Sequence, residues 1–192
     1  MGVCIRMTTL LQRHLDKWID CQDCDLCKTR NKVVQIRGQI PCDVLLVGEA
    51  PGASENNLGA PFVGPAGHLL DRQIDEALSM VRLLDEEHPI AIAFCNLVAC
   101  IPLGEDGKKT AEPSRDQIKA CQSRLVDLMG IAQPRMIILV GRLAAKNLPS
   151  LDSSILIREI RHPAAILRET VATQAMSNKR VVVQLRDAFE GI

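Results

Sequence analysis

The sequence predicts an α/β protein with three αβα layers around a short, mostly parallel central sheet of about four strands. Short apolar runs recur along the 192-residue chain, and segments with helical periodicity separate them. Buried strands that alternate with helices are typical of a parallel sheet covered on both faces. No internal repeat, low-complexity segment or linker divides the chain, so residues 1–192 are expected to form a single domain.

The expected elements follow one another in a regular order. Strands are predicted at residues 43–48, 90–98, 135–141 and 154–160. Helices are predicted at residues 10–20, 67–81, 115–129, 142–148 and 177–189. Ser114 precedes the helix at 115–129 and is expected to be its N-cap.

Composition narrows the classes of function. Basic and acidic residues balance at 23 each, so any binding of nucleic acid must come from a local patch. Aromatic residues make up 2% of the chain, too few for a stacking platform of several rings. No apolar run approaches the ~18 residues that span a bilayer, and the first residues lack the pattern of a secretory signal. An intracellular, cytoplasmic protein with no membrane partner is expected.

The eight cysteines are the most informative part of the composition. Disulfides are disfavoured inside cells, so clustered cysteines indicate metal binding or catalysis. Cys21, Cys24 and Cys27 form a CxxCxxC run, and Cys100 and Cys121 follow far down the chain. Four thiolates from distant segments suit a [4Fe–4S] cluster. On spacing alone, a zinc site and a set of reduced structural or redox thiols remain open.

Polar or glycine-rich loops follow the predicted strands. "GEAPG" begins at Gly48, Asn96 lies at the end of the second strand, "GRLAAK" follows the third, and "RHPAAILR" follows the fourth. Ligands of parallel sheets bind beyond the carboxyl ends of the strands, so these loops are expected to converge on one site. The glycine-rich loop matches neither GxGxxG nor GxxxxGK[ST], which disfavours a dinucleotide site or a P-loop.

The motifs "VGEAPGASENNLGAPFVGPAGHLLD", "NLVAC" and "HPAAILR", with the cysteines, resemble the uracil-DNA glycosylase superfamily. The similarity is greatest to its iron–sulfur branch, often called family 4, and spans about residues 21–168. It implies a DNA repair enzyme, a monofunctional hydrolase that flips out uracil, cuts its N-glycosidic bond and leaves an abasic site. The implied partner is uracil-containing DNA, single- or double-stranded. A monomer in a prokaryotic or viral setting is expected.

The resemblance also implies a cofactor and its ligands. A [4Fe–4S] cluster would be held by Cys21, Cys24, Cys100 and Cys121, and would tie the segment of residues 8–30 to the rest of the domain. Cys27 falls where relatives often have another residue, so it is treated as a spare thiol. Replacement of Cys21 by Cys27 is the competing interpretation.

For the base, the resemblance implies a pocket against the glycine-rich loop, where glycines let the backbone approach sugar and phosphate. Phe62 would stack on the flipped ring, with a core phenylalanine as the competing interpretation. Glu55 would crowd the C5 edge of the ring and so discriminate against the methyl group of thymine. The implied substrate-binding residues are Gly48, Ala50, Gly52, Glu55, Phe62 and Asn96.

Three residues carry the implied chemistry. Asn96 would bind the pairing edge of uracil, and His162 would donate to O2, where negative charge develops as the base leaves. Some members have a water-activating aspartate where this chain has Ala50, so Glu49 is the nearest carboxylate. Glu49 would orient the water, or bind the base only through its backbone neighbours.

The segment around His162 also supplies the implied DNA contacts. Ile166 and Leu167 would wedge into the duplex where the base left. Arg161 and Arg168 would contact phosphates, with solvated surface arginines as the competing interpretation.

The sequence departs from the family in the loop after Cys100. "CIPLGEDGKKT" replaces the usual "CRPPGNR", which loses an arginine and lengthens the loop, and Ala99 stands where a basic residue is common. The alternative function is therefore a non-catalytic or altered-specificity nucleic-acid-binding module on the same scaffold.

Overall fold

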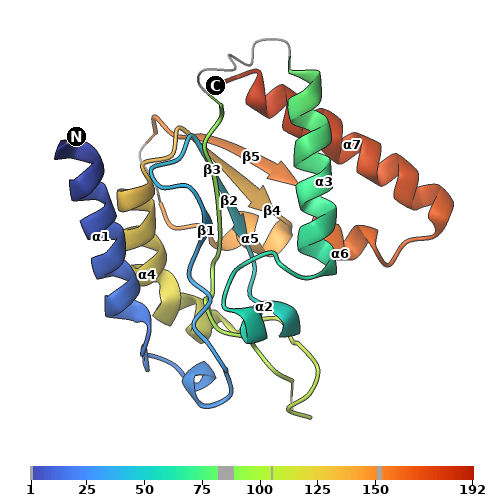
Figure 1. The fold of residues 1–192 in the computed structure, drawn as a ribbon. Helices are drawn as coiled ribbons and strands as arrows, with labels where there is room; N and C mark the ends of the chain where they lie inside the picture. The colour runs from blue at the N-terminus through green and yellow to red at the C-terminus, as the bar shows by residue number, and fades with distance from the viewer. Residues whose placement is uncertain (1, 82–88, 105, 151–152) are drawn as a thin grey trace.

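A computed structural model describes residues 2–81, 89–104, 106–150 and 153–192. Its centre is a five-stranded sheet in the order β1-β3-β2-β4-β5 (Figure 1). The pairs β3–β2, β2–β4 and β4–β5 are parallel, whereas β1 pairs antiparallel with β3. The strands span Arg37–Gly38 (β1), Val44–Gly48 (β2), Ile92–Asn96 (β3), Met136–Val140 (β4) and Leu156–Ile160 (β5).

Helices surround the sheet on both sides. They are α1 (Gly2–Trp18), the 3-10 turn η1 (Asp25–Lys28), α2 (Ala53–Leu58), α3 (Pro65–Met80), α4 (Arg115–Ala132), α5 (Arg142–Asn147), α6 (Pro163–Ile166) and α7 (Val171–Phe189). Of the helices that the structure describes, none is both long and apolar enough to cross a membrane.

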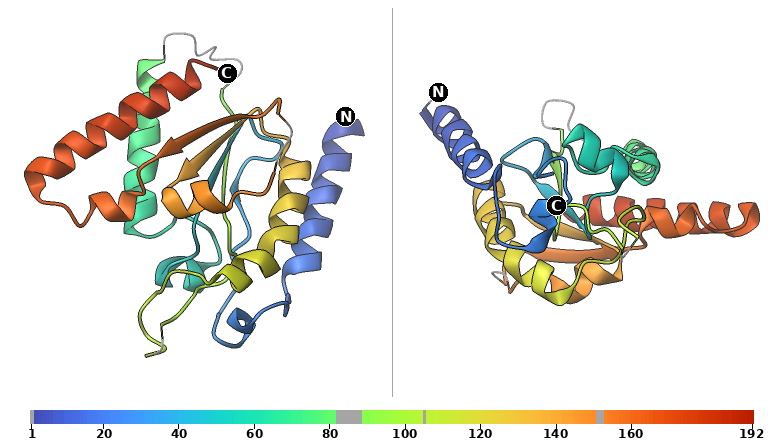
Figure 2. Two further views of the ribbon diagram at one scale, coloured as in Figure 1. Left: turned by 180° about the vertical axis from the view of Figure 1, so that it is seen from behind. Right: turned by 90° about the horizontal axis from the view of Figure 1, so that it is seen from below.

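The predicted three layers are present. Helices α3 and α7 cover one face of the sheet, α4 and α5 cover the other, and α1 lies along α4 (Figure 2). Strands β2, β3 and β4 are buried on both faces, because alternate side chains enter two separate cores, whereas the edge strand β5 is exposed except at Ile160. In β2, Val44 and Leu46 join the core on the α3 and α7 side, while Leu45 and Val47 join the core on the α4 side.

The four predicted strands are confirmed, and β1 is an addition to them. It has only two residues and no apolar alternation that could have marked it in the sequence. Gly38 has a φ of 105°, and a Cβ there would lie 2.3 Å from the carbonyl oxygen of Ile92. The pairing of β1 with β3 thus depends on a close backbone approach that only glycine allows.

The helix ends agree with the sequence in one case and differ in another. Ser114 Oγ accepts a hydrogen bond from Gln117 N at 3.2 Å, and Gln117 Oε1 accepts one from Ser114 N at 2.9 Å, so the expected N-cap is confirmed. Helix α7 begins earlier than the predicted residue 177. In its first turns the apolar residues Val171 and Met176 are exposed, at 86% and 71%. The apolar residues there do not follow the buried face of the helix, so the sequence pattern did not indicate where the helix begins.

The segment before the sheet is tied to the α4 side of the molecule. Lys17 on α1 forms an ion pair with Asp127 on α4. Gln35 Nε2 donates to the carbonyl oxygen of Leu15 at 2.9 Å. These contacts hold α1 and the cysteine-containing turn that follows it against the domain.

Candidate active site

A pocket of about 440 Å³ opens beyond the carboxyl ends of β2, β3 and β5. Three of the four loops expected to converge, those after β2, β3 and β5, meet there, whereas the "GRLAAK" loop after β4 lies outside the lining. Arg161, Ile166 and Leu167 lie outside its lining, and Gly48 lies directly behind its wall. The predicted residues that line it are Glu49, Ala50, Gly52, Glu55, Phe62, Asn96, His162 and Arg168.

Two glycines make room for Phe62 in the pocket wall. A Cβ on Gly48 would lie 2.4 Å from Asn96 Oδ1 and 2.5 Å from Phe62 Cζ. A Cβ on Gly67 would lie 2.0 Å from the carbonyl oxygen of Phe62. A side chain at Gly48 would displace the aromatic ring or the amide, and one at Gly67 would displace the backbone of Phe62, so the glycines allow both residues to lie in one wall.

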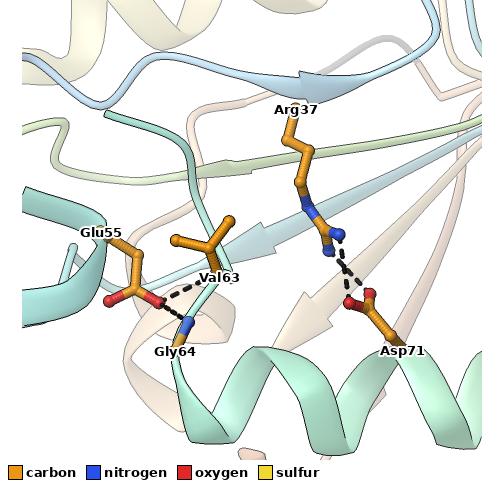
Figure 3. A network of polar contacts seen from close by, with 5 residues as sticks. All are labelled: Arg37, Glu55, Val63, Gly64 and Asp71. Atoms are coloured by element: carbon orange, nitrogen blue, oxygen red, sulfur yellow. Dashed lines mark hydrogen bonds and ion pairs between the residues drawn. The ribbon is translucent and has the colours of Figure 1, made fainter. Parts of the chain in front are cut away.

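Phe62 is fixed by its surroundings. Its φ of 57° is a left-handed conformation that non-glycine residues seldom adopt, and the side chain is 6% exposed. The ring is tilted against that of Phe94, with centroids 5.8 Å apart. The Arg37 guanidinium lies 4.0 Å over the Phe94 ring and pairs with both oxygens of Asp71 on α3 (Figure 3). Phe62 therefore belongs to the hydrophobic core and to the pocket wall at once.

Glu55 braces the loop that carries Phe62. Its Oε2 accepts a hydrogen bond from Gly52 N at 3.1 Å. Its Oε1 accepts from Val63 N at 3.0 Å and from Gly64 N at 2.7 Å (Figure 3). The carboxylate thereby joins the start of α2 to the start of α3 through charge-assisted hydrogen bonds. The shape of the pocket wall depends on these bonds.

Asn96 combines a fixed backbone with an uncommitted side chain. Its carbonyl oxygen accepts a hydrogen bond from Arg124, and the N–H of Leu97 donates to Gly48 O at 2.9 Å. Asn96 is 4% exposed, and its amide forms no hydrogen bond within the described part of the chain. Since an amide donates and accepts at once, it is available to a ligand that offers both kinds of group.

His162 is the N-cap of α6, and its Nδ1 accepts a hydrogen bond from Ala164 N at 3.1 Å. A ring nitrogen that accepts an N–H carries no proton itself, so the neutral ring has its proton on Nε2. Burial lowers the pKa of His162, Arg168 lowers it further, and Glu55 opposes the shift. The pocket thus holds a neutral imidazole that can donate one N–H.

Glu112 brings a second carboxylate to the pocket. It belongs, with Thr110 and Ala111, to the loop before α4, and Glu112 and Ala111 lie just beyond the divergent segment that ends at Thr110. Burial raises the pKa of Glu49, Glu112 raises it further, and Arg168 opposes the shift. A β-bridge between Leu103 and Thr110 folds the loop back. The extra length of this loop was the only available sign of its role.

The cysteines of the predicted cluster lie near one another. Cys100 is buried, and Cys21, Cys24 and Cys121 are half-buried. Burial raises the pKa of the Cys21, Cys24 and Cys100 thiols, to about 11 for Cys100, and Cys121 adds to the rise at each of them. Cys24 and Cys121 pack against the buried core that contains Cys100. The turn after α1, the segment after β3 and helix α4 therefore meet at this core.

Cys121 has two hydrogen-bond donors at its sulfur. Ala99 N donates to Sγ at 3.4 Å and Arg124 Nε at 3.3 Å, which suits a thiolate. Among the described residues, no three or more His, Cys, Asp or Glu side chains are arranged to bind a single metal ion.

Comparison with protein families shows where this arrangement belongs. The profile of the family described as "Uracil DNA glycosylase superfamily" matches residues 37–186, a range that contains every residue of the pocket. The chain belongs to the uracil DNA glycosylase superfamily. The resemblance expected from the sequence motifs is thereby confirmed.

Relatives within the superfamily place the chain in its type-4 branch. The type-4 uracil-DNA glycosylase of Pyrobaculum aerophilum is 38% identical over 69% of this chain and 61% of its own length. That of Sulfurisphaera tokodaii is 33% identical over 71% of this chain and 56% of its own length. That of Archaeoglobus fulgidus is 30% identical over 78% of this chain and 79% of its own length. The chain thus spans less than two thirds of the length of the first two.

The fold is also found in a solved structure. The crystal structure of wild-type SMUG2 from Pedobacter heparinus matches it with a TM-score of 0.53, over 78% of this chain and 75% of that chain. The two sequences are 13% identical, so the likeness concerns the fold alone.

The four residues that the superfamily resemblance assigned to DNA differ in their surroundings. Ile166 is 0% exposed and belongs to the core, so the structure corrects the expectation that its side chain wedges into DNA. Helix α6 turns Ile166 inward and leaves the next residue, Leu167, 40% exposed. Arg168 is exposed at the pocket, whereas Arg161 forms an ion pair with Glu169 outside it.

Proposed function

We propose that the protein is a monofunctional uracil-DNA glycosylase, a repair enzyme that hydrolyses the N-glycosidic bond of uracil in DNA and leaves an abasic site. The observation that carries the proposal is that one pocket contains both Asn96, whose amide has no hydrogen-bond partner among the described residues, and a neutral His162. Together they offer a donor and an acceptor for a pairing edge and an N–H for a carbonyl oxygen. At about 440 Å³, the pocket has the size of a small-molecule site and accommodates one flipped base.

In the proposed reaction, the flipped uracil stacks on Phe62 while Asn96 binds its pairing edge. The bond between C1′ and N1 breaks with its electron pair on uracil, and the sugar gains oxocarbenium character. His162 Nε2 donates to O2, where the negative charge develops, and so lowers the barrier. Glu49 orients the water that adds to C1′ and accepts its proton, a task that a raised pKa suits. The uracil anion takes up a proton from solvent after its release.

We further propose that Cys21, Cys24, Cys100 and Cys121 hold a [4Fe–4S] cluster. The two donors at Cys121, and the packing of Cys24 and Cys121 against the core that contains Cys100, support this ligand set. When bound, the cluster would supply a structural cross-link between the segment that follows α1, the segment that follows β3 and helix α4. Cys27 remains a spare thiol in this assignment.

The cluster makes the protein brown, with broad absorption near ~400 nm. Replacing Cys100 or Cys121 by Ser is expected to remove the absorption and destabilise the fold, because each change removes one of four ligands. Cys27→Ser is the matched control and should leave both unchanged. Metal analysis of anaerobically prepared protein that finds zinc and no iron would contradict the assignment.

The proposed partner is uracil-containing DNA, held at the mouth of the pocket by Leu167 and Arg168, with Arg161 beside them. Glu55 is proposed to guard the C5 edge of the base in addition to bracing its loop. On this proposal the protein acts as a monomer. On this proposal the protein works in the cytoplasm, where a prokaryotic cell keeps its DNA.

The proposal is tested by incubating the purified protein with a uracil-containing oligonucleotide and treating the product with alkali. Strand breakage at the uracil is the expected result, in single-stranded or duplex DNA. The same oligonucleotide with thymine at that position is the control and should remain intact. Binding without breakage, in protein that contains its full complement of iron, would favour a non-catalytic binding module instead.

A further inference from the structure

Arg124 lies on α4 with its entire side chain inside the protein. It is 1% exposed and is the largest fully buried side chain among the described residues. A guanidinium keeps its charge, so its burial is unfavourable unless hydrogen bonds and an anion compensate for the lost water. Its position therefore needs partners, and these identify its role.

The guanidinium joins two parts of the site. Its Nε donates to Cys121 Sγ at 3.3 Å. Its Nη2 donates to the carbonyl oxygen of Asn96 and, at 3.3 Å, to that of Leu97. A single planar side chain thus connects a cysteine of the proposed cluster to the strand end that carries the base-reading amide.

The charge of Arg124 has no carboxylate to balance it. No Asp or Glu in the described part of the chain forms an ion pair with it, and its Nη1 has no hydrogen-bond partner there. Its field acts on its neighbours: burial raises the pKa of Cys95 to about 12, and Arg124 opposes that rise. The sulfur of Cys121 is the group in contact with Arg124 that becomes anionic when it binds iron.

We propose that Arg124 is a positioning residue that couples the cluster to recognition of the base. Its charge balances the metal-bound thiolate of Cys121. Its second nitrogen fixes the carbonyl groups of Asn96 and Leu97, and with them the direction of the Asn96 amide. The inference rests on the proposed glycosylase activity and the proposed cluster.

Two consequences follow from these contacts. A positive charge beside a cluster stabilises its reduced, more negative state, so Arg124 raises the reduction potential. Fixing the backbone of Asn96 also holds its amide ready for the base, which lowers the barrier without adding a contact to DNA.

The test compares two variants of Arg124 with a control. Arg124→Met removes the charge and the donors and keeps a long side chain. Arg124→Lys keeps the charge, but its ammonium is a compact point charge and cannot reproduce the planar fork that spans the three acceptors. Arg115→Met removes an exposed arginine from the first turn of the same helix. Iron content, reduction potential, affinity for uracil-containing DNA and single-turnover cleavage are measured for each protein after anaerobic preparation.

Arg124→Met is expected to lower the reduction potential and to slow single-turnover cleavage about 10–100-fold, as loss of outer-shell partners does at other metal centres. Its affinity for DNA should not change, because Arg124 does not reach the surface. Arg124→Lys should have a potential closer to wild type but still cleave slowly, and Arg115→Met should match wild type throughout. A merely structural arginine would change thermal stability and leave the potential where it was.

The outcomes separate this inference from the proposed function. If the wild-type protein has no iron or does not cleave, both are overturned. If it has iron and cleaves, and Arg124→Met equals it in potential and rate, the inference alone is overturned. Should Arg124→Met fail to fold, Arg124→Lys decides, because a wild-type cleavage rate in that variant would overturn the positioning role.

Discussion

Among the residues of the pocket, His162 acts through a single nitrogen. The hydrogen bond from Ala164 N occupies Nδ1, and the lowered pKa keeps the ring neutral, so Nε2–H is the donor. If this donor acts on charge that exists only in the transition state, its loss slows the chemical step and spares binding. We expect His162→Ala to slow single-turnover cleavage by ~10²–10³ and to leave DNA affinity unchanged. His68→Ala, on the exposed side of α3, is the control. Wild-type cleavage by His162→Ala would shift the chemistry to Glu49 and Asn96.

The carboxylates of Glu49 and Glu112 allow a test of whether Glu49 is the group that accepts a proton from water. Glu112 raises the pKa of Glu49, so removing its charge should lower that pKa. Only ionised Glu49 can accept a proton from water, and the rate should therefore fall on the acid side as Glu49 becomes protonated. We expect Glu112→Gln to move this acid limb of the pH–rate profile to lower pH. Glu76→Gln, exposed on α3, should leave the profile unchanged. An acid limb that stays in place in Glu112→Gln would show that Glu49 is not the titrating group.

At the scale of elements, the short helix α6 assigns opposite roles to two adjacent apolar residues. Ile166 is buried in the core, and Leu167 is 40% exposed next to Arg168, which lines the pocket. Leu167→Ala is expected to weaken binding to uracil-containing duplex and to spare single strands, which have no stacked gap to fill. Ile166→Ala should instead lower the free energy of unfolding by about 2–5 kcal/mol through the cavity it leaves. Equal loss of duplex and single-strand binding in Leu167→Ala would remove it from the DNA interface.

The same helix shows what could be predicted from the sequence and what could not. Continuous apolar runs marked β2 and β4, and the loops after β2, β3 and β5 marked the pocket, because periodicity and topology determine both. The run "HPAAILR" does not say which of Ile166 and Leu167 turns inward, since that depends on how α6 packs against α3 and α7. Glu112 reaches the pocket only because its loop folds back, which is a long-range property.

At the scale of the whole molecule, the seating of α1 on α4 includes a buried histidine. His14 is 3% exposed, and neither ring nitrogen has a hydrogen-bond partner within the described residues. Burial lowers its pKa to about 4; Arg124 and Lys17 lower it further, and Asp127 opposes them. An imidazole in this position is tolerated in its neutral form, so protonation should favour the unfolded chain.

The stability of the protein should therefore depend on pH through His14. In the unfolded chain the pKa of His14 returns to 6.5. Between pH 6.5 and about pH 4, His14 is therefore protonated in the unfolded state and neutral in the folded state. The free energy of unfolding should fall as pH drops through this window, by up to about 3 kcal/mol. We expect His14→Leu to remove this part of the pH dependence in urea unfolding, whereas His68→Leu should retain it. If His14→Leu lost stability with falling pH as steeply as wild type, other groups would have to account for the acid sensitivity, and the seating of α1 would not depend on a neutral histidine.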